Sequence, residues 1–548
     1  MKNPTIRPLF PVYVVSLAVL LLLVSGIALS SEPRYGGTFV HAAPTDPHHL
    51  APPLTSSSPT VGPASAVVEA LVQLRYRDGS VNIEPLLAES WDISADGTTY
   101  TFQLRQGVTW HDGEPFTSAD VKFTIEEVVL PYHPLGARVW ATLDRIETPD
   151  PHTVVVHLEK PFPILELLGI GLGIGGIIPQ HLYEGTDIPA NPYNARPVGT
   201  GPFKFESWDR GERIVLVRND NYWDETRPYL DRIVWRTVPD NTSIINGLLT
   251  GEIDQTDWLA VPYPQIDRLE ASPNVRIAET PQASAQQQLI KFNLRHPALG
   301  NQLVRQAIAH AVDRELVQDL VFFGLSQPST AHISSTLGPE RWHADKPLNR
   351  YDYDVEKANQ LLDEAGFPRD DDGNRFSIVH TFANLQEFQL TFSTVLAEQL
   401  AEVGIEVTPR VLDYAAFLER VYTDWDFDIM SHTLSHGPLP EFFVSRFYVS
   451  SNIQPGITFS NAMGYVNEEI DSLWDTVPFE ADPEQRREQF YRIQDILADE
   501  LPLLPIWEVY FPLPVSVEFH NTGLSPHQAG GDKGWRDIWW ENAPRTAP

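Results

Sequence analysis

The sequence predicts an α/β protein built as two unlike lobes, and three observations lead to this prediction. The chain has 548 residues, which is more than one ordinary domain contains. Strand patterns dominate the first half, whereas helices alternate with strands in the second half. The chain then closes with a proline-rich, strand-like segment over residues 501–519. A hydrophobic content of 42% and a charged content of 20% are typical of a folded globular protein.

The first thirty residues have the three-part layout of a secretory signal. Lys2 and Arg7 give a positive start, and an apolar run follows over residues 12–24. Ala28 and Ser30 then place small residues before a cleavage point after Ser30. The uncharged stretch over residues 9–31 is also long enough to span a membrane, so a retained anchor is the alternative. We expect residues 1–30 to be cleaved and the protein to be periplasmic.

The composition excludes several kinds of function. No cysteine is present, which rules out disulfides, thiol catalysis, thiolate metal sites and a lipid-carrying cysteine. The formal net charge is −34, and loss of Lys2 and Arg7 with the signal leaves 37 basic against 73 acidic residues, or about −36. Such a surface repels nucleic-acid phosphates and anionic lipid headgroups. We therefore expect no nucleic-acid partner.

The first half contains a strand followed by a helix. Tyr100, Phe102 and Leu104 alternate with polar residues after the turn signal Asp96-Gly97, a pattern that predicts a strand. Thr117 and Asp120 form a capping-box pair, which predicts that a helix begins there.

The second half repeats the helix signal at regular intervals. Predicted helices lie over residues 303–312, from the cap Asp354 to Gly366, over residues 390–403, and from Asp482-Pro483 onward. A strand over residues 405–407 directly follows the third of these helices. This alternation favours an α/β arrangement for the second lobe.

Four blocks of sequence, taken in order, resemble the family-5 extracellular solute-binding proteins. The blocks are Leu87–Trp91 with Tyr100–Leu104 and His111-Asp-Gly113, then Val198–Phe203 with Tyr222-Trp223, then Val304–Ile308 with Ala311–Arg314, and finally Tyr353–Ala358 with Gly366. They cover nearly the whole chain after the signal. The family comprises dipeptide, oligopeptide and nickel receptors of ABC importers.

The resemblance implies a fold and a division of the chain. The fold is a two-lobed periplasmic binding protein of type II, similar to cluster C, with an extra domain on the first lobe. The first lobe would hold residues 31–288 and 508–548, with the extra domain over roughly 77–200, and the second lobe would hold residues 289–507. Two hinge strands would lie near residues 289–293 and 504–509. The resemblance implies a monomer that delivers solute to ABC permease subunits in the inner membrane, without catalysis and without a cofactor.

The resemblance also places the ligand anchors, and this chain departs from them. Peptide-binding members carry an aspartate that pairs with the α-amino group of the ligand, and a tryptophan three residues earlier. Aligned on the prolines of that loop, these positions are His436 and Thr433 here. Glu441 is near enough to replace the aspartate on a shifted loop. Losing a buried partner of an ammonium costs a few kcal/mol, so a free-amine dipeptide should not bind in the standard way.

Further residues are candidates for the walls of the cleft. They are Trp258, Gln286, Gln287, Asn384 and Ser57. Each has an ordinary alternative, since Trp258 would equally serve as core and His436 as an exposed loop residue. His432 and His436 raise the possibility of a nickel site, but two histidines four apart share a face only on a helix. We therefore expect no metal site.

The expected function is capture of a peptide or peptide-like solute in the periplasm. The alternative is a receptor for a non-peptide solute such as an oligosaccharide, an opine-like conjugate or chelated nickel. A secreted hydrolase is a more remote alternative, because the sequence contains no Gly-x-Ser-x-Gly elbow and no His-Glu-x-x-His motif.

Overall fold

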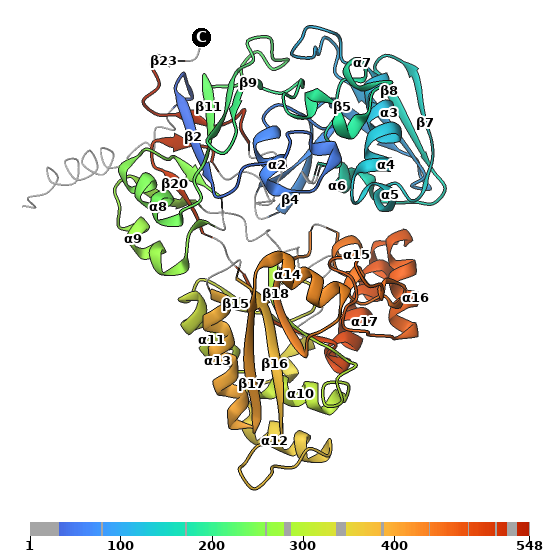
Figure 1. Cartoon of the computed structure of the whole chain (residues 1–548). Helices are drawn as coiled ribbons and strands as arrows, with labels where there is room; N and C mark the ends of the chain where they lie inside the picture. Colours follow the sequence, from blue (N-terminus) through green and yellow to red (C-terminus); the bar gives the residue numbers. More distant parts are fainter. Residues whose placement is uncertain are drawn as a thin grey trace, which may run out of the picture.

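The computed structural model describes residues 32–77, 80–169, 173–257, 260–278, 286–335, 347–384, 388–437, 439–480, 482–509, 512–522 and 534–546. Within these ranges the protein forms two bodies, each built around its own sheet (Figure 1). The first lobe is built on a seven-stranded sheet and the second lobe on a six-stranded sheet. No helix in these ranges is both long enough and apolar enough to cross a membrane.

The seven-stranded sheet draws its strands from distant parts of the chain. Its order is β13-β20-β12-β2-β11-β10-β9. The strands are β2 (Thr38–Ala43), β9 (Phe203–Asp209), β10 (Arg213–Arg218), β11 (Arg232–Thr237), β12 (Gln255–Thr256), β13 (Val275–Ala278) and β20 (Leu513–Ser516). Helices α8 (Asn241–Thr250) and α9 (Ile266–Glu270) supply the apolar cluster that covers its β12–β13 end. A strand from the end of the chain therefore completes a sheet that begins near residue 38.

A separate four-stranded sheet stands on the first lobe. Its order is β5-β6-β8-β7, and the strands are β5 (Ala88–Ile93), β6 (Thr99–Leu104), β7 (Leu143–Asp150) and β8 (Thr153–Leu158). Helix α3 (Ser118–Phe123) packs near β7 and β8, and the short helices α5 (Gly136–Val139) and α6 (Ile164–Leu168) follow. The predicted strand at Tyr100 is β6. The predicted capping box is also present, since Thr117 and Asp120 bond reciprocally at the start of α3.

The six-stranded sheet is drawn from one continuous stretch of chain. Its order is β15-β19-β14-β18-β16-β17. The strands are β14 (Gln286–Phe292), β15 (Gln327–Pro328), β16 (Phe376–Ala383), β17 (Ile405–Leu412), β18 (Ile429–Ser435) and β19 (Leu503–Glu508). Figure 1 shows helices α10 (Gln302–Ala311), α11 (Arg314–Phe322), α12 (Val355–Glu364) and α13 (Phe388–Glu402) around it. The four helices predicted in this half are α10, α12, α13 and α17 (Pro483–Glu500), so those predictions are confirmed.

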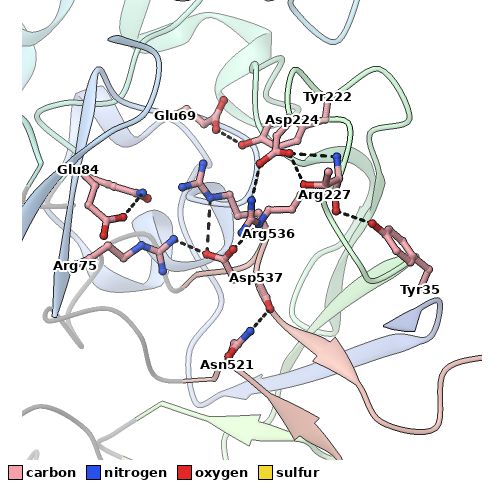
Figure 2. Close-up of polar contacts among 12 residues, drawn as sticks. Tyr35, Glu69, Arg75, Glu84, Tyr222, Asp224, Arg227, Asn521, Arg536 and Asp537 are labelled. Carbon is pink, nitrogen blue, oxygen red and sulfur yellow. Dashed lines mark hydrogen bonds and ion pairs between the residues drawn. The ribbon is translucent and has the colours of Figure 1, made fainter. Parts of the chain in front are cut away.

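A polar cluster ties the C-terminal segment to the first lobe (Figure 2). Asp537 accepts a hydrogen bond from Arg75 at 2.9 Å and forms an ion pair with Arg227 at 2.6 Å. Arg75 is almost fully buried, with a side-chain exposure of 2%. Close by, strand β1 (Arg34–Tyr35) pairs with β23 (Arg545–Thr546). The two ends of the described chain are therefore joined on the same lobe.

A small cavity of about 60 Å³ lies inside the first lobe beside this cluster. Glu69, Gln73 and Arg536 are among the residues that line it. Burial raises the pKa of Glu69 to about 7, although Tyr222, Trp223 and Thr200 all donate hydrogen bonds to its carboxylate. Since one ordered water takes up about 10–15 Å³ of such space, the cavity suits a few waters and is too small for a peptide.

We expect Asp537→Ala to destabilise the protein by about 3 kcal/mol, because it removes the ion-pair partner of the buried Arg75. Urea unfolding measures the effect. The matched control is Asp209→Ala, whose partner Arg213 lies on the surface at 3.0 Å and should contribute less than about 1 kcal/mol. Equal losses in the two variants would contradict the structural role given to Asp537.

Candidate ligand-binding site

The two lobes are connected by strands that lie side by side. β14 pairs antiparallel with β19, and Gln287 is opposite Glu508. Just beyond these ends, the backbone N–H of Val509 donates to the carbonyl of Gln286 at 2.9 Å. The chain leaves the seven-stranded sheet after β13, enters the six-stranded sheet at β14, and returns from β19 to β20. The polar ends of β14 and β19 therefore lie at the junction between the lobes.

A chain of hydrogen bonds links three elements at this junction. Gln287 donates through Nε2 to Glu508 Oε1 at 3.1 Å. Glu508 also accepts from the hydroxyl of Ser334 and from the backbone N–H of Ser335. The backbone N–H of Ser334 donates to Nδ1 of His436 at 3.1 Å. Two residues predicted from the sequence, Gln287 and His436, thus belong to one buried network whose centre is Glu508.

His436 is a neutral imidazole whose ring is oriented by a hydrogen bond. It follows β18 directly and has an exposure of 1%. Burial, followed by the charges of His332 and Arg446, lowers its pKa to about 3. Because Nδ1 accepts a hydrogen bond, the ring proton lies on Nε2. The residue at the predicted anchor position is therefore a hydrogen-bond donor at neutral pH, whereas an aspartate there would be an anion.

Thr433 lies on the opposite face of the same sheet from His436. Successive side chains of a strand alternate between faces, and Thr433 is opposite Gln288 in the register. Its hydroxyl donates to Gln288 Oε1 at 2.6 Å. Gln288 and Gln389 exchange amide hydrogen bonds, and Ser431 donates to Gln389 at 2.8 Å. Thr433 therefore belongs to a polar network that joins the sheet to the start of α13.

Glu441 is already engaged by an arginine. It lies on α15 (Pro440–Phe443) with an exposure of 3% and forms an ion pair with Arg486 on α17. Burial raises the pKa of its carboxyl, and Arg486 opposes that shift. The backbone carbonyl of Glu441 accepts from Arg138 on α5 at 3.2 Å, and Arg138 also donates to the hydroxyl of Ser445 at 2.7 Å.

These Arg138 contacts join the two lobes directly. The ring of Phe162, from the first lobe, meets the edge of Phe442 with centroids 5.2 Å apart and lies 6.2 Å from Phe479. Arg138 also lies over Phe442 at 5.4 Å. One buried apolar cluster accordingly contains residues from both lobes. The lobes are therefore in contact at the side where α15 faces α5 and α6 (Figure 1).

The remaining predicted residues lie in different places. Gln286 is buried beside Gln287 at the start of β14. Asn384 is exposed just after β16, and Ser57 is exposed at the N-terminus of α2 (Ser58–Ala64) on the first lobe. Trp258 lies outside the described residues. Neither Asn384 nor Ser57 is hydrogen-bonded within the described ranges to the network around Glu508, whose members come from β14, β19, the segment at 334–335 and His436.

Sequence reasoning missed Glu508, although a signal was present. The strand reads Leu-Leu-Pro-Ile-Trp-Glu, and a carboxylate at the end of an apolar strand is uncommon enough to be noticed. Lys291 gives the same signal in β14, where it follows Leu289 and Ile290. Among the ranges that the structure describes, no group of three or more histidine, aspartate or glutamate side chains is arranged to hold a metal ion.

Comparison with known proteins defines the family. Residues 82–455 match the family described as "Bacterial extracellular solute-binding proteins, family 5 Middle". This match covers more than half of the chain, and the protein belongs to that family of two-lobed solute-binding proteins.

Individual relatives are similar over most of their length. The glutathione-binding protein GsiB of Salmonella typhi is 29% identical over 78% of this chain and 81% of its own. The oligopeptide-binding protein AppA of Bacillus subtilis is 28% identical over 86% of each chain. The solved structure of the periplasmic binding protein DppA from Helicobacter pylori, in complex with the peptide STSA, superposes with a TM-score of 0.75 at 25% identity. It covers 93% of this chain and 99% of that one.

We expect Arg138→Met to favour the open arrangement of the ligand-free protein. The variant removes hydrogen bonds from a charged group to Glu441 and Ser445. Such bonds contribute about 1.5–3 kcal/mol each, so the open–closed equilibrium should shift about tenfold or more. Small-angle X-ray scattering should show a larger radius of gyration. Arg145→Met is the control, because Arg145 is exposed on β7 of the same lobe. An equal change in both variants would contradict the role given to Arg138.

Proposed function

We propose that this protein is the substrate-binding component of an ABC importer, and that it captures a peptide or peptide-like solute between its lobes. The observation that supports this proposal is the share of this chain over which its named relatives align. Relatives named for binding glutathione and oligopeptides align over 78% and 86% of this chain, so the likeness extends across both lobes. Those relatives are solute-binding proteins, not enzymes. The partners would be the permease subunits of the importer, which sense closure of the lobes over solute.

We propose the following division and location of the chain. Residues 31–288 and 508–548 form the first lobe, with the extra domain over roughly 77–200, and residues 289–507 form the second lobe. The six-stranded sheet, drawn from residues 286–508, supports the boundaries, and the four-stranded sheet over residues 88–158 supports the extra domain. Residues 1–30 act as a cleaved signal that directs a monomer to the periplasm. This segment lies outside the described residues.

We propose that His436, from the second lobe, and Gln287, on the first crossover strand, contact the solute, with Gln286 beside Gln287 and Ser57 opposite on the first lobe. Support comes from the position of Gln287 at the end of the paired crossover strands and of His436 just after the neighbouring strand β18, in one hydrogen-bond network. Thr433 and Asn384 would shape the wall of the second lobe, and Trp258 that of the first. Glu441 would hold α15 against α17 through Arg486.

A thermal-shift screen of residues 31–548 tests the proposal. The panel contains di- to hexapeptides, glutathione, N-acetylated peptides, oligosaccharides and nickel chelates. A ligand at 100 times its Kd adds about 2.7 kcal/mol to stability, so a true solute gives a clear rise in Tm. We expect peptides to raise the Tm and His436→Ala to weaken the rise. A response confined to sugars or nickel chelates would overturn the peptide assignment and favour the non-peptide alternative.

A further inference from the structure

Cationic and donor groups for which the described residues supply no acidic partner gather on the side of the six-stranded sheet that also carries His436. We call Lys291, Arg446, His432 and Tyr422 the cationic cluster. Lys291 lies on β14 and His432 on β18, and Arg446 belongs to the single turn over residues 445–447. The charge of Arg446 acts on Lys291, on His432 and on His436, so Arg446 lies within electrostatic range of both the strand residues of the cluster and the predicted anchor position.

Lys291 is the most unusual member. Its side chain is fully buried, and Nζ has no hydrogen-bond acceptor among the described residues. The ammonium faces the ring of Phe447 at 3.9 Å. Burial, followed by the charge of Arg446, lowers the pKa of Lys291 well below its usual value. A cation–π contact offsets only part of the free-energy cost of taking an ammonium out of water. Lys291 therefore occupies an unfavourable buried position that no counter-charge among the described residues relieves.

Arg446 and His432 form the reachable part of the cluster. Both are half-buried, and both pack against the ring of Phe459 at 5.1 and 5.5 Å. Nε of Arg446 donates to the carbonyl of Phe443 at 3.0 Å, and the terminal nitrogens of the guanidinium have no acceptor among the described residues. Beneath them, the hydroxyl of Tyr422 is buried and has no partner within the described ranges.

Nearby carboxylates are already engaged elsewhere. Glu441 forms an ion pair with Arg486, and Glu508 accepts from Gln287, Ser334 and Ser335. No carboxylate is among the groups whose charge shifts the pKa of Lys291, Arg446, His432 or His436. In a chain of net charge −34, several donors and two basic side chains thus lie together with no acid among them in the part of the chain that the structure describes.

We propose that the cationic cluster receives an anionic group of the solute, a carboxylate, and that the protein selects acidic peptide-like solutes. The carboxylate contacts Arg446 and His432, while the ammonium of Lys291 supplies charge from below. The inference rests on the proposed function, because it names the ligand class of the same site. It also accounts for a neutral histidine at the anchor position, since an aspartate there would repel the incoming anion.

Calorimetric titration with matched ligand pairs tests the inference. The pairs are Ala-Glu against Ala-Gln, Ala-Ala against its C-terminal amide, and glutarate against its monoamide. We expect the acid of at least one pair to bind about tenfold more tightly than its amide, as a charge-assisted contact would. Arg446→Gln should abolish that difference. Arg492→Gln removes the same charge from an exposed pair with Glu469 and should preserve it.

Lys291→Met separates a ligand role from a structural one. If Lys291 serves the solute, methionine should raise the Tm, because it removes an unpaired buried amine, and should lower the affinity for the acidic ligand by about tenfold. A fall in Tm with unchanged affinity would make the lysine structural and would overturn the inference. This variant also keeps the test decisive if Arg446→Gln does not fold.

The outcomes distinguish the inference from the proposed function. Equal affinity within every pair, or a preference that survives Arg446→Gln, overturns the anionic site while peptide binding stands. Binding of glutarate alone, lost in Arg446→Gln, supports the anionic site and overturns the peptide assignment. If no acid in the panel binds, both proposals fall.

Discussion

The antiparallel pairing of β14 with β19 is the constraint on which the rest of the molecule depends. Each strand carries the chain across the junction of the lobes, in opposite directions, and the two are hydrogen-bonded neighbours in the six-stranded sheet. Both crossover strands are held in one sheet. We therefore expect the hinge axis between the lobes to lie at the end of that sheet, where the two strands leave it. The residues at that end, Gln287 and Glu508, are fixed relative to each other whatever the lobes do. The hydrogen-bond network around Glu508 can therefore keep its geometry when the first lobe moves.

Acidic and basic side chains near this junction differ in how well they are paired. The acids close to it already have partners, since Glu441 pairs with Arg486 through Oε1 and Glu508 has three donors. Within the described ranges the bases have no acid beside them: Lys291 faces the rings of Phe447 and Tyr422, and Arg446 donates to one carbonyl. Burial keeps His432 and His436 neutral, with the pKa of each lowered to about 3. Just after β18 this chain carries a neutral histidine, at the position where the family resemblance leads us to expect an aspartate.

Much of the fold could be predicted because its signals are local. Capping at Thr117, Asp354 and Asp482 depends on side chains that bond to backbone a few residues away, and the helices begin where these residues predict. The site was harder to predict, because its residues meet through tertiary contacts. Ser334 reaches His436 across 102 positions of sequence, and Glu508 reaches Ser334 across 174. No periodicity records such contacts, so the centre of the network at Glu508 was missed while its outer members Gln287 and His436 were found.

The first lobe is assembled from both ends of the chain, and this has a consequence for the order of folding. Every strand of the six-stranded sheet is synthesised in one stretch, whereas the seven-stranded sheet needs β20 and the first lobe also needs β23 to pair with β1. Strands β12 and β13 therefore lack their shared neighbour β20 until the second lobe has been made. A polypeptide threaded through a membrane in an extended state meets this requirement naturally, since its earliest segments cannot close into a finished lobe before the last strands arrive.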